Sequence, residues 1–176
     1  MILFALFAIA SVNSYGILGA SPTIKVTNIE KCDTDDEPVP WSFEISNVDA
    51  NAYKKVNAEF DLSDFAFNDE ISYTLDVDKL NDGDWKKDIY NDEGNLCDLI
   101  RQYVPKAWQK LMGALQPRPI DMCNAQKAVY RLKNFELLRQ DVQLPAFDGK
   151  LRTTLRLFDK DDKNVFCTST EVEVSR

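Results

Sequence analysis

Histidine is absent from this chain of 176 residues. Without imidazole the chain cannot form a Ser-His-Asp or Cys-His catalytic set, an HExxH zinc site or a histidine pH switch. A composition of 44% hydrophobic and 28% charged residues also disfavours collagen-like, coiled-coil and wholly disordered classes. The length suits one globular domain, and the missing histidines point to binding rather than catalysis.

Three common functional motifs are absent as well: the GxSxG elbow, the P-loop and the GxGxxG fingerprint. Paired carboxylates could hydrolyse glycosides without histidine. The 29 acidic residues, however, include runs such as residues 33–37, which are typical of solvated loops. We therefore predict no enzymatic activity and no cofactor. A carboxylate hydrolase is the alternative, and it would need two acids converging in a cleft.

Negative charge dominates the chain, but acidic and basic residues are unevenly distributed along it. The formal net charge is −8, which disfavours a nucleic-acid partner because phosphates would be repelled. Residues 25–96 hold 7 basic and 19 acidic side chains, whereas residues 97–156 hold 11 basic and 5 acidic ones. The basic segment includes Arg101, Lys106, Lys110, Arg118, Lys127, Arg131 and Lys133. It could contact anionic lipid headgroups or a membrane surface, or be a solvated basic face.

The first 24 residues contain no charged side chain, and residues 2–10 form an apolar run. A run of this length is too short to span a membrane. Small and polar residues follow it, as in a secretory signal peptide and its cleavage zone. We predict a signal peptide over residues 1–20, a mature domain over 21–176 and secretion to the extracellular space. The alternative is a buried N-terminal helix.

Four cysteines, Cys32, Cys97, Cys123 and Cys167, are then expected to form disulfides, because secretion places them in an oxidising compartment. None lies in a CxxC pair, and no histidine could complete a zinc site. Four cysteines allow three connectivities. We favour Cys32 with Cys167 and Cys97 with Cys123, since the first bridge would join the first strand to the last.

Two-residue alternation of apolar and polar side chains predicts about seven β-strands. They fall at residues 24–29, 41–46, 56–62, 71–77, 129–138, 151–158 and 165–174. Asp82 and Gly83 are typical of a hairpin turn. Within 151–158, the odd-numbered residues are expected on one face of the sheet and the even-numbered ones on the other.

The period changes to three and four residues after Gly94, which predicts a helix. Asn95 is its expected N-cap, and Pro105 predicts a kink or two short helices. The fold we expect is mainly β: an immunoglobulin-like two-sheet β-sandwich or cup with one helical excursion bordering the opening. The apolar helical positions are Leu96, Leu99, Ile100, Tyr103, Val104, Ala107, Trp108, Leu111, Met112 and Leu115.

Residues 159–164 superficially match the start of an EF-hand calcium loop. Lys163 would occupy a ligand position, the glycine is missing, and Thr170 stands where a bidentate glutamate is needed. A solvated hairpin turn is the preferred interpretation, and we predict no metal site.

Aromatic residues make up 11% of the chain, enough to fill a core or to line a cavity between two sheets. A filled core is the usual case. If a cavity exists, we expect Lys106 and Lys110 to lie near a lipid headgroup or membrane. Its predicted ligand-binding residues are Phe60, Phe65, Phe67, Trp108, Leu111, Met112, Leu115 and Phe135.

The identity and spacing of certain residues resemble the pattern of an insect family of secreted proteins that includes the CheB gustatory proteins. The set comprises residues 96–100, Cys123, Tyr130, Leu132, Asn134, residues 144–145, Gly149, residues 151–152 and Cys167. That family is similar to the GM2 activator, a lipid-binding β-cup of the MD-2-related lipid-recognition class. Asn124 departs from the family pattern, which usually has proline there, and this chain has fewer cysteines than the GM2 activator.

The resemblance implies the same cysteine pairing and a non-enzymatic, chemosensory binding protein. Its ligand would be a lipid or a pheromone-like hydrocarbon held between the sheets. The alternative is an extracellular protein-recognition module with a solid core that acts with a receptor. An apolar cavity would favour the first, and close packing the second.

Overall fold

The computed structural model describes residues 23–32, 39–47, 54–121, 123–136 and 148–175. The predicted signal peptide, the acidic run at 33–37 and residues 144–145 of the family pattern lie outside these ranges.

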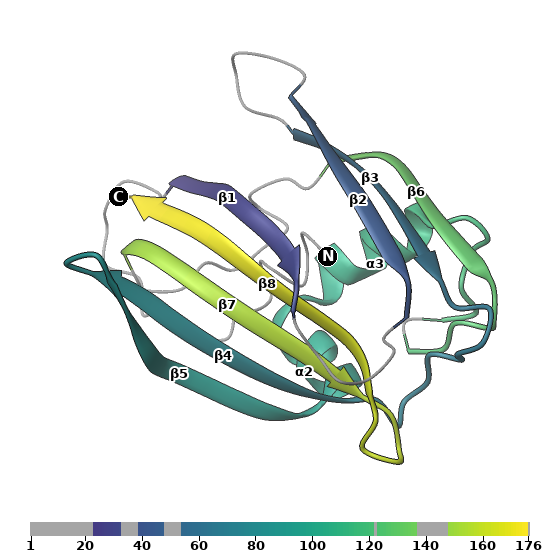
Figure 1. Ribbon diagram of the computed structural model, residues 1–176. Coiled ribbons are helices and arrows are strands. Elements are labelled where there is room, and N and C mark those ends of the chain that lie inside the picture. Colours follow the sequence, from purple (N-terminus) through teal and green to yellow (C-terminus); the bar gives the residue numbers. More distant parts are fainter. Residues whose placement is uncertain (1–22, 33–38, 48–53, 122, 137–147, 176) are drawn as a thin grey trace.

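Two antiparallel sheets form the body of the molecule (Figure 1). The larger sheet has the strand order β1-β8-β7-β4-β5, and the smaller has β2-β3-β6. The mainly β, two-sheet fold expected from the sequence is therefore confirmed. The strands are β1 (Thr23–Lys31), β2 (Trp41–Asn47), β3 (Lys54–Asp61), β4 (Ser72–Asn81), β5 (Asp84–Asn95), β6 (Val129–Glu136), β7 (Gly149–Phe158) and β8 (Asn164–Ser175).

One strand of the larger sheet, β5, was not predicted: the described residues form eight strands, where the sequence predicted about seven. Its sequence has no run of alternating apolar residues, because most of its side chains are exposed at the sheet edge. Backbone pairing with β4, from Ser72 opposite Asn95 to Asn81 opposite Asp84, defines it instead. The predicted hairpin turn is present, and Asp82 and Gly83 both have positive φ, as a type I′ turn requires.

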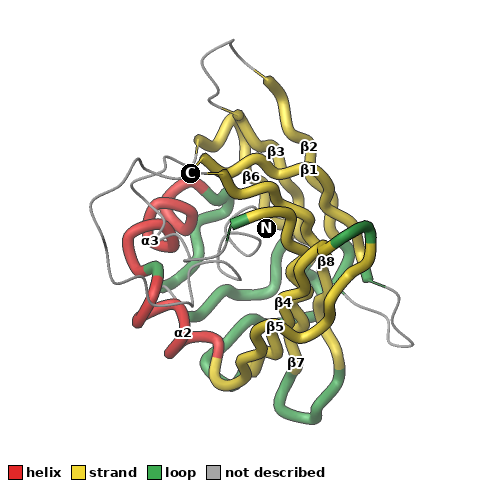
Figure 2. Tube along the Cα trace, turned by 90° about the vertical axis from the view of Figure 1, so that its left-hand side faces the viewer, coloured by secondary structure: helices red, strands yellow, loops and turns green. Residues whose placement is uncertain are grey.

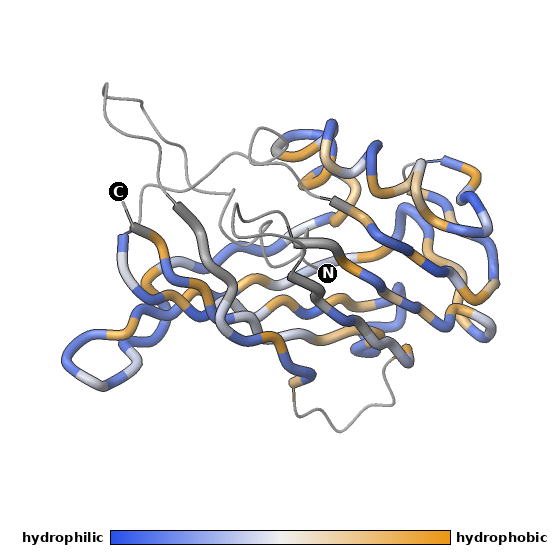
Figure 3. Tube along the Cα trace, turned by 90° about the horizontal axis from the view of Figure 1, so that it is seen from above, coloured by the Kyte–Doolittle hydropathy of each residue, from blue (hydrophilic) through white to orange (hydrophobic). Residues whose placement is uncertain are grey.

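Alternation in β4 and β7 places apolar side chains on the inner face of the larger sheet. Leu75, Leu151 and Leu155 are all almost fully buried, whereas the even-numbered neighbours in β7 are partly exposed. The colouring in Figure 3 shows the same alternation of hydrophilic and hydrophobic positions along the strands. The predicted division of residues 151–158 between two faces is confirmed.

The outer face of the larger sheet is occupied by ion pairs that cross neighbouring strands. Arg152 Nη2 lies 2.9 Å from Glu171 Oε1, and Arg156 Nη1 lies 2.8 Å from Asp76 Oδ2. The Arg152 guanidinium also stacks over the Trp85 ring, 4.0 Å from its centroid. These charges satisfy one another, so an apolar ligand would have to bind on the inner side of the sheet.

Two helices follow β5 directly: α2 (Leu96–Tyr103) and α3 (Pro105–Ala114). Pro105 begins α3, where its missing N–H costs nothing, and Val104 separates the two helices. The expected break at this proline is thus present as two short helices. Figure 2 shows both helices on one side of the molecule, across from β4, β7 and β8.

Asn95 caps α2 as the sequence predicts. Its Oδ1 accepts hydrogen bonds from the backbone N–H groups of Cys97 and Asp98, at 2.9 and 3.2 Å. Its Nδ2 also donates to the Asp69 carbonyl, so the cap joins the helix to the segment before β4.

Replacing Asn95 with alanine is expected to lower the free energy of unfolding by about 1 kcal/mol, because two helical N–H groups lose their acceptor. Urea unfolding measures the change. The matched control is Asn91→Ala on exposed β5, which should stay within about 0.5 kcal/mol. Equal losses in the two variants would contradict the capping role.

Both favoured disulfides are present. Cys32–Cys167 joins the end of β1 to β8, with 5.4 Å between the Cα atoms, and Cys97–Cys123 joins α2 to the segment that follows α3. The residues between β7 and β8 form the expected turn, closed by a hydrogen bond from Asp159 N to the Lys163 carbonyl.

Most buried side chains of the described residues belong to one hydrophobic cluster that draws on both sheets and both helices. Val77, Leu151, Val172 and Val174 form a second, smaller cluster on the larger sheet. The large cluster is where the sheets and α3 face one another, and it contains the candidate site.

Candidate binding cavity

An apolar cavity lies between α3 and the two sheets. Its volume is about 90 Å³ and it is partly open to solvent; the empty space rises to about 710 Å³ when that open solvent is counted. The lining residues are Val39, Phe60, Leu62, Phe65, Phe67, Trp108, Leu111, Met112, Leu115, Pro119, Ala125, Tyr130, Leu157, Val165 and Phe166.

Each layer of the fold supplies part of the wall. The larger sheet contributes Leu157, Val165 and Phe166 from β7 and β8, while the smaller sheet contributes Phe60 and Tyr130, which are directly paired across β3 and β6. Helix α3 covers them because its buried residues recur at helical spacing along one side. Eight of the fifteen lining residues therefore belong to helices or strands.

Irregular segments complete the wall, and backbone hydrogen bonds hold them in place. The Ala125 N–H donates to the Phe67 carbonyl at 2.9 Å, joining the segment after β3 to the segment before β6. The Val39 N–H donates to the Val165 carbonyl at 2.8 Å. These bonds fix Phe67 and Ala125 across from α3, where the Phe67 ring packs 6.3 Å from the Trp108 ring.

The cavity surface, as the described residues form it, exposes only apolar atoms. Tyr130 contributes its ring, because its hydroxyl donates to the Gln126 carbonyl at 2.9 Å. Burial raises the pKa of this hydroxyl above its ordinary value of 10.0, so the side chain is neutral at physiological pH. The walls can bind hydrocarbon but offer no hydrogen bond to a polar group.

Seven of the eight predicted ligand-binding residues lie around this one cavity: Phe60, Phe65, Phe67, Trp108, Leu111, Met112 and Leu115. The eighth, Phe135, lies elsewhere in the core on β6. Its ring is covered by Lys110, whose Nζ lies 5.9 Å from the ring centroid. Lys106 and Lys110 are both on the exposed side of α3.

Eight lining residues were not predicted: Val39, Leu62, Pro119, Ala125, Tyr130, Leu157, Val165 and Phe166. Alternation along the strands placed Leu157 on an inner face, but which part of that face borders a cavity depends on the packing of α3. Pro119 and Ala125 lie in irregular segments whose sequence carries no periodic signal. The alternation of Tyr130 and Leu132 with charged residues could have placed Tyr130 on an inner face, and the register of β3 and β6 sets it beside Phe60.

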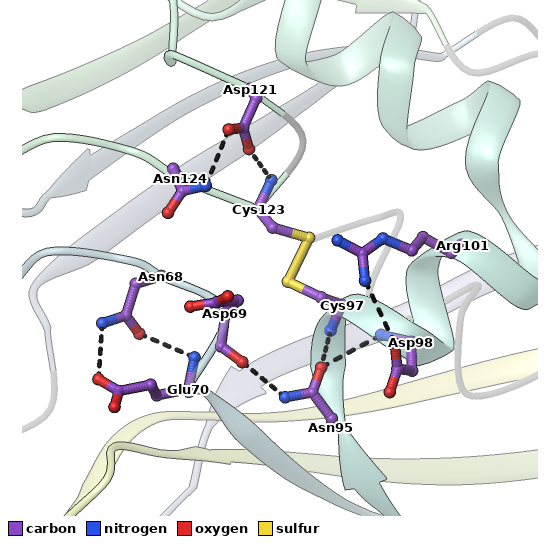
Figure 4. The surroundings of a disulfide bond; sticks show 10 residues. All are labelled: Asn68, Asp69, Glu70, Asn95, Cys97, Asp98, Arg101, Asp121, Cys123 and Asn124. Atoms are coloured by element: carbon purple, nitrogen blue, oxygen red, sulfur yellow. Dashed lines mark hydrogen bonds and ion pairs between the residues drawn. A yellow bond between two sulfur atoms is a disulfide. The ribbon is translucent and has the colours of Figure 1, made fainter.

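The Cys97–Cys123 bridge anchors the segment that carries Pro119 (Figure 4). Asp121 accepts hydrogen bonds from the Cys123 N–H at 2.7 Å and from the Asn124 side chain at 2.8 Å. These bonds lower the pKa of Asp121 below its ordinary value of 3.8. The bridge, together with this turn, ties one wall of the cavity to the start of α2.

Stability is expected to be nearly constant between about pH 5.5 and pH 8, because no histidine titrates there. Asp61 and Asp121 have lowered pKa values in the folded protein, Asp61 because of its hydrogen bonds from Ser63. The unfolded chain therefore takes up protons first, and the stabilisation from these carboxylates is lost as the pH falls through about 4.

Urea unfolding at a series of pH values checks this expectation. A step in the unfolding free energy between pH 5.5 and 7.5 would contradict it. Asp121→Asn should reduce the loss of stability at acid pH, since this residue then no longer titrates.

Fold and cavity together define a two-sheet β protein with an apolar hollow under a helix. The sequence matches no known family model and no curated protein. Among solved structures, it is similar to chicken MD-1 complexed with lipid IVa, with a TM-score of 0.40 and 14% identity. That alignment covers 89% of this chain and 93% of the MD-1 chain.

The described ranges contain neither a membrane-spanning helix nor a metal site. Neither α2 nor α3 is long and apolar enough to cross a membrane. No group of three or more cysteine, aspartate or glutamate side chains among these residues is arranged to hold a metal ion.

Proposed function

We propose that this protein is a secreted, non-enzymatic carrier that binds a hydrophobic ligand, a lipid or a pheromone-like hydrocarbon, in the cavity under α3. The observation that carries the proposal is the wholly apolar cavity between the sheets. Burying a methylene group there is worth about 0.8 kcal/mol. The cavity favours the carrier over the alternative of a solid-core recognition module.

The export of the protein is part of the proposal. A signal peptide over residues 1–20 would deliver a domain over 21–176 to an oxidising compartment, and the two disulfides suit such a compartment. The residue pattern resembling the insect family with the CheB gustatory proteins fits the same role. Amino-terminal sequencing of secreted protein tests the cleavage, which is expected near residue 16 or 20.

Ligand extraction tests the carrier function directly. Protein secreted from expressing cells is purified, extracted with organic solvent and analysed by mass spectrometry, and the emptied protein is titrated with a fluorescent fatty acid. We expect an extracted hydrophobic compound and saturable binding of the fluorescent probe. Protein that is always empty and never binds the probe would contradict the proposal.

Lys106 and Lys110 would contact the ligand's acidic headgroup or an anionic membrane outside the cavity. They lie on the exposed side of α3, the same helix that lines the cavity with Trp108 and Met112. Replacing both lysines with alanine is expected to weaken octanoate binding by about two- to fivefold, the range for exposed ion pairs. Octanol binding should not change, and equal effects on both ligands would contradict headgroup contact.

A further inference from the structure

The size of the cavity limits which hydrophobic ligand it can take. An apolar cavity of about 150 Å³ accepts one benzene ring of six carbons. The cavity of this protein, at about 90 Å³, is smaller, so such a ring would not fit fully between its walls. By the same scale it takes roughly four carbons of a chain, and two chains side by side would need about twice the available space.

The chemistry of the walls sets a second limit. A polar group carried into the cavity would lose its hydrogen bonds to water and find no replacement, because the Tyr130 hydroxyl is already donated to Gln126. Such an unpaired group costs about 1–3 kcal/mol. The part of the ligand that enters must therefore be plain hydrocarbon.

We propose that the cavity binds the end of one unbranched alkyl chain, with the polar headgroup outside, and rejects two-chain lipids and ring systems. This inference rests on the carrier function proposed above and narrows its ligand class. A volume of about 90 Å³ holds roughly the last four carbons, and we expect the benefit of lengthening the chain to end at about eight to ten carbons, once the added methylene groups lie in solvent.

A chain-length series provides the test. Fatty acids of 4 to 16 carbons are measured for displacement of the fluorescent probe below their critical micelle concentrations. We expect affinity to rise by about fourfold per added methylene, and then to level off at about eight to ten carbons. Affinity that still rises at this rate from 10 to 14 carbons would overturn the proposal.

Three analogues test selectivity at fixed chain length. A terminal hydroxyl on octanoate should weaken binding by about tenfold or more, because it loses its hydrogen bonds to water. A terminal phenyl ring on a short-chain acid should have a similar effect, because the ring exceeds the cavity volume. A two-chain dioctanoyl phosphatidic acid should bind no tighter than its single-chain lyso form. Equal binding of the hydroxylated or phenyl acid, or tighter binding of the two-chain lipid, would overturn the assignment.

Two substitutions that each change a wall side chain by three heavy atoms should move the chain length at which affinity levels off in opposite directions. Ala125→Leu adds three heavy atoms to the wall and should shift the levelling-off to shorter chains by about three carbons. Met112→Ala removes three and should shift it to longer chains by a similar amount. Ala66→Leu, exposed in the segment before β4, is the matched control and should not change the series.

The outcomes separate this inference from the carrier proposal. If no chain of any length binds, the carrier function itself fails. If chains bind but show neither a length limit nor a shift in the two variants, the carrier function stands and the single-chain assignment is wrong.

Discussion

Replacing Ala125 with tryptophan is expected to weaken binding of a fluorescent fatty acid by about 200-fold. Ala125 lines the cavity from the segment before β6, and its backbone is held by the hydrogen bond to Phe67. An indole ring at this position is larger than the enclosed space, so it would replace the chain end. Losing about four buried methylene groups at about 0.8 kcal/mol each accounts for this loss of affinity.

The control for this prediction is Ala66→Trp, which places the same ring on an exposed residue of the neighbouring segment. It should bind the probe as the unmodified protein does. Thermal unfolding of both variants shows whether the fold is retained. Wild-type affinity in a folded Ala125→Trp variant would show that the ligand does not occupy this cavity.

Removing the Cys32–Cys167 bridge is expected to cost about 5 kcal/mol of unfolding free energy, the largest stability effect we anticipate. The bridge closes a loop with a sequence separation of 135 residues, and the chain-entropy relation converts this length into that value. The geometry supports the effect, since β1 reaches the rest of the sheet only through β8. We expect Tm to fall by about 10–20 °C in the double serine variant.

The Cys97–Cys123 bridge provides the internal comparison. Its sequence separation is only 26 residues, for which the same relation gives about 3.5 kcal/mol. Urea unfolding of both double serine variants ranks the two bridges. If the Cys97/Cys123 variant proves less stable than the Cys32/Cys167 variant, wall anchoring rather than loop length controls stability.

The sequence predicted the strands in which buried apolar residues alternate with more exposed ones. Strands β4 and β7 have an apolar residue at every second position because one face packs in the core. Helix α2 was signalled by Asn95, and the break before α3 by Pro105, since both residues act locally. Edge strand β5 was not predicted, because its mostly exposed side chains show no alternation of apolar and polar residues. Backbone pairing with β4 defines this strand instead.

Residues that line the cavity were predictable only where they belong to a periodic element or an aromatic-rich segment. Trp108, Leu111 and Met112 share a helix face, so they were expected together. Phe135 has the same composition signal, yet it packs under Lys110 in the core, because strand register and not residue type decides which aromatic borders a hollow. The cavity itself depends on how α3 packs against the two sheets, and no local sequence pattern predicts this packing.

Fluorescence quenching of Trp108 by a brominated fatty acid tests the central claim most directly. In a variant that keeps Trp108 as its single tryptophan (Trp41→Phe, Trp85→Phe), the indole lies in the cavity wall. Terminally brominated octanoate should quench it in a saturable manner, while a variant retaining only Trp85, which stacks with Arg152 on the outer face, should be unaffected. Unquenched Trp108 at saturating ligand would contradict binding in this cavity.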